Sequence, residues 1–133
     1  MRKKQKSQEF ELRSVSAGFP SPAEDLAKSP LDLNTLLITD SASTFFLKAS
    51  GDSMIEAGIL DGDILVVDKS LSPKNRDIVI ASINGEFMVK RYLCEKNGNK
   101  SLHAENKLFP PVKITAFSEA KIWGVVTSAI HRF

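Results

Sequence analysis

Two side chains of this sequence could together cut a peptide bond. Ser53 carries a hydroxyl that could attack a carbonyl, and Lys90 carries an amine that could take the proton of that hydroxyl. The bond between Ala17 and Gly18 lies upstream of both and joins two small residues that would fit a narrow site. If all three features are functional, the protein is its own substrate.

Ser53 also has a purely structural explanation. Residues 53–56 fit a capping box, in which a serine caps a helix and a glutamate three residues later completes the motif. The same position suits a nucleophile, because free backbone N–H groups at the start of a helix can stabilise an oxyanion. Gly51 would allow a sharp turn there and leave room for a substrate backbone. In that case Gly51, Asp52 and Met54 are candidates for stabilising an oxyanion or binding the substrate.

The pair Asn84-Gly85 fixes the surroundings expected for Lys90. Placed between two apolar runs, it predicts a two-residue type I′ hairpin, and pairing outward from that turn sets Val79 opposite Lys90. Because side chains alternate along a strand, Lys90 then shares one face of the sheet with mainly apolar residues. These neighbours are Met88, Tyr92, Val79 and Ala81.

Lysine can act as a base only in its neutral form. Its pKa in water is about 10.4, and burial among apolar groups lowers that value. The hairpin supplies such surroundings, although Asp77 is close enough in register to hold the amine charged. A lysine exposed at the edge of the sheet is the structural alternative.

A histidine is the more usual partner of a nucleophilic serine, and the chain has two. His131 is followed only by Arg132 and Phe133, and a chain end is a poor place for rigid catalytic geometry. His103 has Glu105 close behind it, but Ser53 lacks the Gly-x-Ser-x-Gly elbow of many serine hydrolases. The sequence therefore gives a Ser-His-Asp hydrolase little support.

The composition bounds the possible functions. The 133 residues suffice for one domain, and a net charge of +2 leaves no strong nucleic-acid footprint. The single cysteine excludes an intrachain disulfide and fits a reducing, cytoplasmic compartment. No apolar stretch approaches the ~20 residues that span a bilayer. We expect no membrane segment, no metal site and no cofactor.

The elements that must position these residues are mainly strands. Short runs rich in β-branched and aromatic residues, separated by turn residues, predict a mostly β, sandwich- or barrel-like domain with one or two short helices. The expected strands are 44–48, 64–67, 78–83, 87–93, 101–104, 113–115 and 122–126.

The chain before these strands should be less regular. Residues 1–16 are polar and lack periodicity, which is typical of a flexible arm, and Pro20 and Pro22 favour an extended tether over 18–22. Ser21 has the pattern of a helix start, with Ser29-Pro30 ending that helix. A second short helix or a turn is expected within 31–38.

Several short motifs follow one another in a set order along the chain. They are Gly51-Asp52-Ser53-Met54, Asp61-Gly62-Asp63, and the runs 77–81 and 85–91. In this order they resemble the LexA/UmuD family of self-cleaving serine peptidases, and residues 18–23 and 32–38 are similar to its UmuD branch. The resemblance covers about residues 17–126. One departure is Arg76, where relatives often have glycine, so Asn75 is expected to take the positive φ instead.

The resemblance implies a role for each candidate residue. Ser53 would be the nucleophile, Lys90 the general base, and Ala17-Gly18 the cleaved bond. Residues 1–17 would then be a flexible arm removed by self-cleavage, and residues 18–133 a peptidase-like β domain.

The resemblance also implies a biological setting. It points to a homodimer whose self-cleavage is stimulated by a RecA filament on single-stranded DNA. The shortened form would serve an error-prone Y-family DNA polymerase as accessory subunit in the SOS response. Because no helix-turn-helix domain precedes the cleavage site, sequence-specific DNA binding is not expected.

Three alternatives stay open at this stage. A non-catalytic β domain that binds partners would keep Ser53 as a cap and Lys90 as a surface charge. A LexA- or phage-repressor-type peptidase domain could lack its DNA-binding part. A peptidase acting on other chains, similar to bacterial signal peptidases, would use the same Ser/Lys chemistry.

Overall fold

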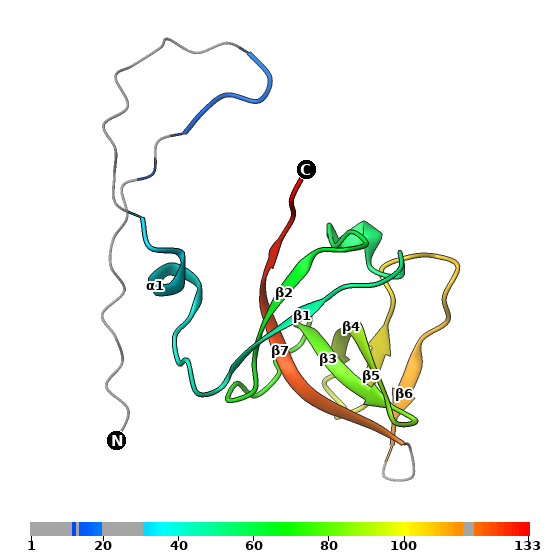
Figure 1. The fold of residues 1–133 in the computed structure, drawn as a ribbon. Coiled ribbons are helices and arrows are strands. Elements are labelled where there is room, and N and C mark those ends of the chain that lie inside the picture. Colours follow the sequence, from blue (N-terminus) through cyan, green and yellow to red (C-terminus); the bar gives the residue numbers. More distant parts are fainter. Residues whose placement is uncertain (1–11, 13, 20–30, 116–118) are drawn as a thin grey trace. The chain divides into compact units, whose positions relative to one another are not determined.

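The strands form one antiparallel sheet. The computed structural model describes residues 12, 14–19, 31–115 and 119–133, and within them seven strands pair in the order β1-β2-β7-β3-β4-β5-β6 (Figure 1). Their bounds are β1 Thr44–Lys48, β2 Ile64–Asp68, β3 Ile78–Ile83, β4 Glu86–Cys94, β5 Lys100–His103, β6 Val112–Ile114 and β7 Ala120–Ile130. The mostly β fold is confirmed, and the expected sandwich or barrel is a single curled sheet.

Aromatic contacts on one face show how strongly the sheet curls. Phe45 of β1 and Phe87 of β4 both contact Trp123 of β7, with ring centroids 5.1 and 5.3 Å apart. In the strand order, β1 and β4 are separated by β2, β7 and β3. Side chains from strands so far apart can meet only on the concave face of a curled sheet.

The long central strand β7 is bent where it meets its neighbours. Its pairing shifts register opposite Val66/Val67 of β2 and opposite Ile80/Ala81 of β3. Such bulges bend a strand and increase its twist. At Gly124 a Cβ atom would lie 2.7 Å from Val67 Cγ1, so β7 can approach β2 this closely only with glycine at that position.

The hairpin between β3 and β4 has the predicted turn and register. Asn84 and Gly85 both have positive φ, 50° and 81°, as a type I′ turn requires. Val79 pairs with Lys90, four residue pairs along from the Ile83–Glu86 pair that closes the turn.

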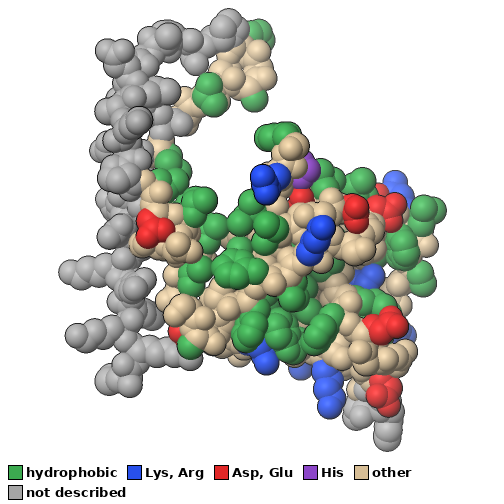
Figure 2. Space-filling view, in the orientation of Figure 1, with side chains coloured by type: hydrophobic (Ala, Val, Ile, Leu, Met, Phe, Trp, Pro, Cys, Tyr) green, Lys and Arg blue, Asp and Glu red, His purple; other side chains and the backbone are tan. Residues whose placement is uncertain are grey.

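Two clusters of buried side chains stabilise the sheet. The alternation along β3 separates them, since Ile80 belongs to the first cluster, and Val79 and Ala81 to the second. The first cluster also includes Met54 and Leu65, and the second includes Tyr92. Hydrophobic side chains also gather on the surface of this part of the chain (Figure 2).

The residue before Asp77 differs from the expectation. Arg76, not Asn75, has the positive φ, at 76°. The Asn75 side-chain oxygen accepts a hydrogen bond from the Cys94 N–H at 2.9 Å, and the Arg76 N–H donates to the Tyr92 carbonyl at 2.8 Å. Because Asn75 is held by its side chain, the reversal of the chain falls on Arg76.

The chain divides into two units, Met1–Thr39 and Asp40–Phe133, and the sheet belongs to the second. In the first unit the short helix α1, Leu33–Leu37, confirms the element expected within 31–38. Asp32 caps it by accepting the Asn34 N–H at 2.9 Å. Most of the arm expected over 1–16, and the helix expected from Ser21, fall outside the described residues. Among the residues described, no helix is long and apolar enough to cross a membrane.

Candidate active site

Ser53 and Lys90 line the same cavity in the second unit. The cavity has a volume of about 410 Å³ and lies between β1, β4 and the loop that follows β1. Gly51 and Asp52 line it together with Ser53, whereas Met54 does not. The other lining residues are Leu47, Lys48, Ala49, Ser50, Leu65, Ile80, Phe87, Met88, Val89 and Phe109. The curl of the sheet thus brings together two residues that lie 37 positions apart (90 minus 53).

Lys90 is buried where the hairpin register places it. Lys90 is only 8% exposed, and its cross-strand partner Val79 is fully buried. The carboxylate of Asp77 accepts the Lys74 N–H, and Lys90 forms no ion pair with any residue that the structure describes. Burial therefore lowers the pKa of Lys90 below its usual value of 10.5.

One contact favours the charged form of the Lys90 amine and so acts against the effect of burial on its pKa. The ring of Phe109 lies 5.7 Å from Lys90 Nζ, and an aromatic face favours the charged form of a lysine. The same ring also covers the amine. The pKa of Lys90 is nevertheless lowered, because desolvation is the dominant effect on this amine.

The expectation that Ser53 caps a helix is wrong. The helical turn η1, Ile55–Ala57, is a 3-10 turn that begins two residues after Ser53, and Met54 occupies its N-cap position without a side-chain hydrogen bond. Met54 is only 2% exposed and packs in the first core cluster. Because this side chain is drawn into the core, the chain becomes helical only after it, and the Ser53 hydroxyl accepts no capping hydrogen bond from the residues that the structure describes.

The Asp61-Gly62-Asp63 turn holds the loop that carries Ser53. The Gly51 N–H donates to Asp61 Oδ1 at 2.7 Å, and the Ala49 N–H donates to the Asp63 carbonyl at 2.8 Å. Gly51 itself has φ of 89°, which confirms the sharp turn expected there. The two turns are thus tied together immediately before Ser53.

This arrangement narrows the candidates for stabilising an oxyanion. The Gly51 N–H already donates to Asp61, so it is not available to a substrate in this conformation. The N–H groups of Asp52 and Met54 have no acceptor among the residues described. Met54, with its side chain in the core, could contribute only its backbone.

Neither histidine lines the cavity that contains Ser53. His131 Nδ1 lies 2.7 Å from Asp63 Oδ1, so this residue is held in place despite its nearness to the chain end. His103 Nε2 lies 2.7 Å from the Ser101 hydroxyl and is not paired with Glu105. The described residues give neither histidine a place beside Ser53.

Sequence reasoning missed the segment between β5 and β6. Phe109 lines the cavity, and Asn106 Nδ2 donates to the Asp52 carbonyl at 3.1 Å. These residues belong to no local motif, and the hydrogen bond from Asn106 to Asp52 joins positions 54 residues apart in the chain. Only the three-dimensional structure reveals them.

The expected cleavage bond lies in the first unit. Ala17 and Gly18 are both exposed, as are the flanking Val15 and Phe19 at 88% and 87%. Exposure of this kind is what a protease-accessible segment requires.

Comparisons with known proteins agree with the motifs. A family model described as peptidase S24-like matches residues 10–127. Protein ImpA of Salmonella typhimurium is 47% identical over 116 residues, which cover 87% of this chain and 78% of that protein. Protein MucA of Escherichia coli is 43% identical over 122 residues, or 91% and 82% of the two chains.

A more distant relative has a longer chain. The LexA repressor of Carboxydothermus hydrogenoformans is 36% identical over 123 residues, which cover 92% of this chain but 59% of the repressor. Together with the family match, these similarities confirm the resemblance that the motifs indicated. The chain belongs to the peptidase S24-like family, whose LexA/UmuD-like members are self-cleaving serine peptidases, and within it is a UmuD-like SOS mutagenesis protein.

Proposed function

We propose that this protein cuts its own Ala17-Gly18 bond with Ser53 and Lys90 as a catalytic pair. The observation that carries the proposal is the shared cavity, in which a half-buried serine and a lysine only 8% exposed both lie. A buried amine without an ion-pair partner among the described residues loses its proton more readily than one in water. Once neutral, it can activate a hydroxyl.

The reaction has two steps. Neutral Lys90 takes the hydroxyl proton of Ser53, and Ser53 Oγ forms a bond to the carbonyl carbon of Ala17. The bond from that carbon to the Gly18 nitrogen then breaks, and the nitrogen leaves with the proton from Lys90. Water, activated by the same amine, hydrolyses the resulting ester and frees Ser53. Backbone N–H groups near Ser53, with Asp52 and Met54 as candidates, would stabilise the oxyanion.

The substrate is part of the same chain, so binding costs little. Tethering converts attack into an effectively unimolecular step, and small side chains at Ala17 and Gly18 suit a narrow site. The products are the arm, residues 1–17, and the β domain, residues 18–133.

Regulation then depends on how often the cleavage segment occupies the site. We propose that a RecA filament on single-stranded DNA favours the occupied state, which shifts a population without changing the chemistry. The shortened form, as a homodimer, would act as accessory subunit of an error-prone Y-family DNA polymerase. These partners rest on the family resemblance.

The test is the mass of the purified protein after incubation at alkaline pH. We expect one product that lacks the first 17 residues, formed at a rate independent of protein concentration and increasing with pH as Lys90 loses its proton. Ser53→Ala should stay intact because it lacks the nucleophile. Ser50 carries the other serine hydroxyl among the described residues that line this cavity, and Ser50→Ala is therefore the matched control. Cleavage of Ser53→Ala at the normal rate would remove Ser53 from the mechanism.

Two further outcomes separate the alternatives. A rate proportional to protein concentration would identify a peptidase that acts on other chains. An intact protein at every pH, with or without a RecA filament, would favour a non-catalytic partner-binding domain.

A further inference from the structure

The segment between β5 and β6 contacts both sides of the candidate active site. We call residues 105–109 the bridging segment. It touches the loop that carries Ser53 through backbone and amide hydrogen bonds, and it touches β4 beside Lys90 through an ion pair and an aromatic ring.

On the serine side, the bridging segment holds the chain before and after the nucleophile. The Glu56 N–H donates to the Glu105 carbonyl at 2.9 Å, and Asn106 Nδ2 donates to the Asp52 carbonyl at 3.1 Å. Asp52 immediately precedes Ser53, and Glu56 follows it by three residues. Movement of the bridging segment would therefore move Ser53.

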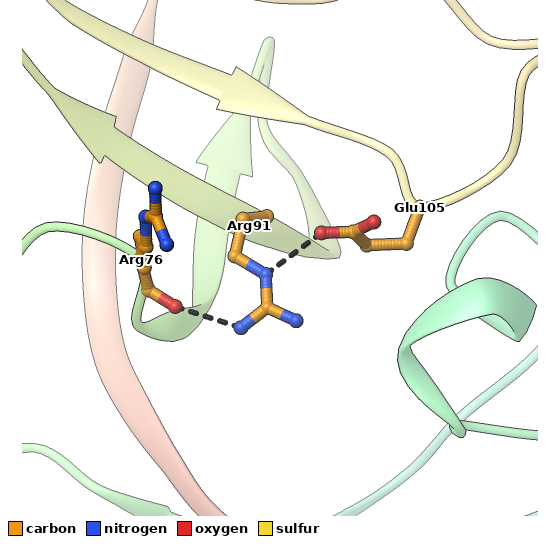
Figure 3. Close-up of polar contacts among 3 residues, drawn as sticks. All are labelled: Arg76, Arg91 and Glu105. Atoms are coloured by element: carbon orange, nitrogen blue, oxygen red, sulfur yellow. Dashed lines mark hydrogen bonds and ion pairs between the residues drawn. The ribbon is translucent and has the colours of Figure 1, made fainter.

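On the lysine side, the anchor is Arg91, the residue next to Lys90. Arg91 Nε donates to Glu105 Oε1 at 2.8 Å, and Arg91 Nη1 donates to the Arg76 carbonyl at 2.7 Å (Figure 3). The two side chains of the ion pair are 26% and 31% exposed, so water screens the pair only in part. A guanidinium held at two nitrogens has little freedom to rotate, and a charge-assisted bond is stronger than a neutral one.

The far end of the segment covers the amine itself. Phe109 lines the cavity, and its ring lies 5.7 Å from Lys90 Nζ. Leu108, by contrast, is 84% exposed and does not line the cavity. The segment therefore presents one aromatic side chain to the cavity and its neighbour to solvent.

We propose that Glu105 is a positioning residue for self-cleavage, which fixes the bridging segment on Arg91 so that Asn106 holds the Ser53 loop and Phe109 shields Lys90. This inference rests on the proposed function. A misplacement of about 1 Å can slow a reaction about 100-fold, so a contact outside the cavity can control the rate. Without the ion pair, the segment keeps its hydrogen bonds to the serine loop but loses its anchor on β4, so that it can shift away from Lys90 and admit water to the amine.

The experiment compares Glu105→Ala with Glu105→Gln and with the matched control Leu108→Ala. For each folded variant the rate of self-cleavage is measured across alkaline pH, and thermal unfolding is recorded to correct for unfolded protein. Glu105→Ala should cleave about 10- to 100-fold more slowly. Its pH midpoint should lie higher than that of the wild type, because a hydrated Lys90 holds its proton to higher pH. Glu105→Gln, which keeps an acceptor for Arg91 Nε, should recover most of the rate, and Leu108→Ala should match the wild type.

A second measurement does not depend on cleavage. The pKa of Lys90 can be followed by NMR titration in a Ser53→Ala background, where the chain stays intact. Adding Glu105→Ala should raise that pKa, and adding Leu108→Ala should not. If Glu105→Ala does not fold, Asn106→Ala tests the serine side alone and should slow cleavage while leaving the pH midpoint in place.

The outcomes separate the inference from the proposed function. If the wild type cleaves and Glu105→Ala has the same rate and midpoint, the inference is overturned and the proposed function stands. A slower rate with an unchanged midpoint and an unchanged Lys90 pKa overturns the shielding of Lys90 and with it the inference. If the wild type never cleaves, the proposed function fails, and the NMR titration alone decides whether Glu105 controls the surroundings of Lys90.

Discussion

The two sides of the candidate active site are built in different ways. Lys90 lies in the middle of β4, where pairing with β3 fixes its register and its neighbours. Ser53 lies in a loop without strand pairing, held by side chains from elsewhere in the chain, among them Asp61 and Asn106. The proposed base is therefore part of the sheet framework, and the proposed nucleophile lies in a loop attached to that framework.

The difference has energetic consequences. On the strand side, the buried amine lowers the stability of the fold, because the framework must exclude water around a group that prefers its charged form in solution. On the loop side, Ser53 is half-buried and its loop depends on a few hydrogen bonds, each of which contributes about 1 kcal/mol. Changes on the strand side should thus affect stability and chemistry together, whereas changes on the loop side should affect mainly chemistry.

The largest effect is expected for Lys90→Met. Self-cleavage should fall at least 100-fold, since a general base typically contributes about 10²–10⁴. The free energy of unfolding at neutral pH should increase, because an apolar side chain of similar length replaces a buried amine. Lys113→Met, at an exposed position on β6, is the matched control and should change neither quantity. A less stable Lys90→Met would contradict the claim that the amine is held at a cost.

The pH dependence of stability follows from the same burial. Because the folded pKa of Lys90 lies below the unfolded one, the cost is complete at pH values below the folded pKa. It disappears as pH rises from the folded pKa toward the unfolded value near 10.5. Denaturant unfolding of the Ser53→Ala protein should therefore show a gain in stability over this alkaline range. The same protein with Lys90→Met should lack that gain.

A pair of glycines tests the two sides directly. Gly51 in the serine loop and Gly85 in the β3–β4 hairpin have φ of 89° and 81°, and a Cβ atom would meet no atom within 4 Å at either position. Alanine at each site should therefore cost a similar amount of stability, about 1 kcal/mol, from the left-handed backbone alone. Only Gly51→Ala should also slow cleavage, by about tenfold or more, because it moves Ser53.

The measurement is a comparison of cleavage rates per folded molecule. Equal slowing by Gly51→Ala and Gly85→Ala would mean that a change in the serine loop affects cleavage no more than a change in the β3–β4 hairpin. That result would remove the distinction between the two sides.

The strand side could be predicted from sequence because its signals are local. The pair Asn84-Gly85 determines a turn, the turn determines a register, and the register places Lys90 opposite Val79. The strand bounds were likewise predicted within a few residues. The exception is β7, which extends over Ala120–Ile130 because β2 and β3 both pair with it, and that pairing is not visible in its own residues.

The loop side could be predicted only in part. Gly51 indicated a turn, but the capping box around Ser53 competed with burial of Met54, and burial prevailed. At Arg76, likewise, the side chain of Asn75 decided which residue reversed the chain. The contacts of Asp61 and Asn106 with the serine loop join distant positions through a few atoms, and a single sequence contains no pattern for such contacts.

The smallest effect is expected around Asp63, whose carbonyl accepts the Ala49 N–H and so helps to hold the serine loop. The pKa of Asp63 is lowered, first by the hydrogen bond from the Leu60 N–H and further by His131, although burial of the carboxyl acts against both. A carboxylate with a lowered pKa stabilises the fold at pH values above its unfolded pKa, and this stabilisation is lost as pH falls through its folded pKa. Because the Leu60 bond is the larger cause, His131→Ala should raise the midpoint of acid unfolding only slightly. Its effect on stability should be less than that of either glycine variant.

Asp63→Asn should have a larger effect at neutral pH than His131→Ala, since the buried side chain would lose its charge at both contacts while keeping its size. Cleavage should nevertheless stay close to the wild-type rate in His131→Ala, because the Ala49 N–H bonds to the backbone of Asp63 and not to its carboxylate. The measurement is the rate of self-cleavage of each variant together with its acid unfolding curve. A large loss of cleavage in His131→Ala would mean that the serine loop depends on the chain end as strongly as on the Asp61 turn.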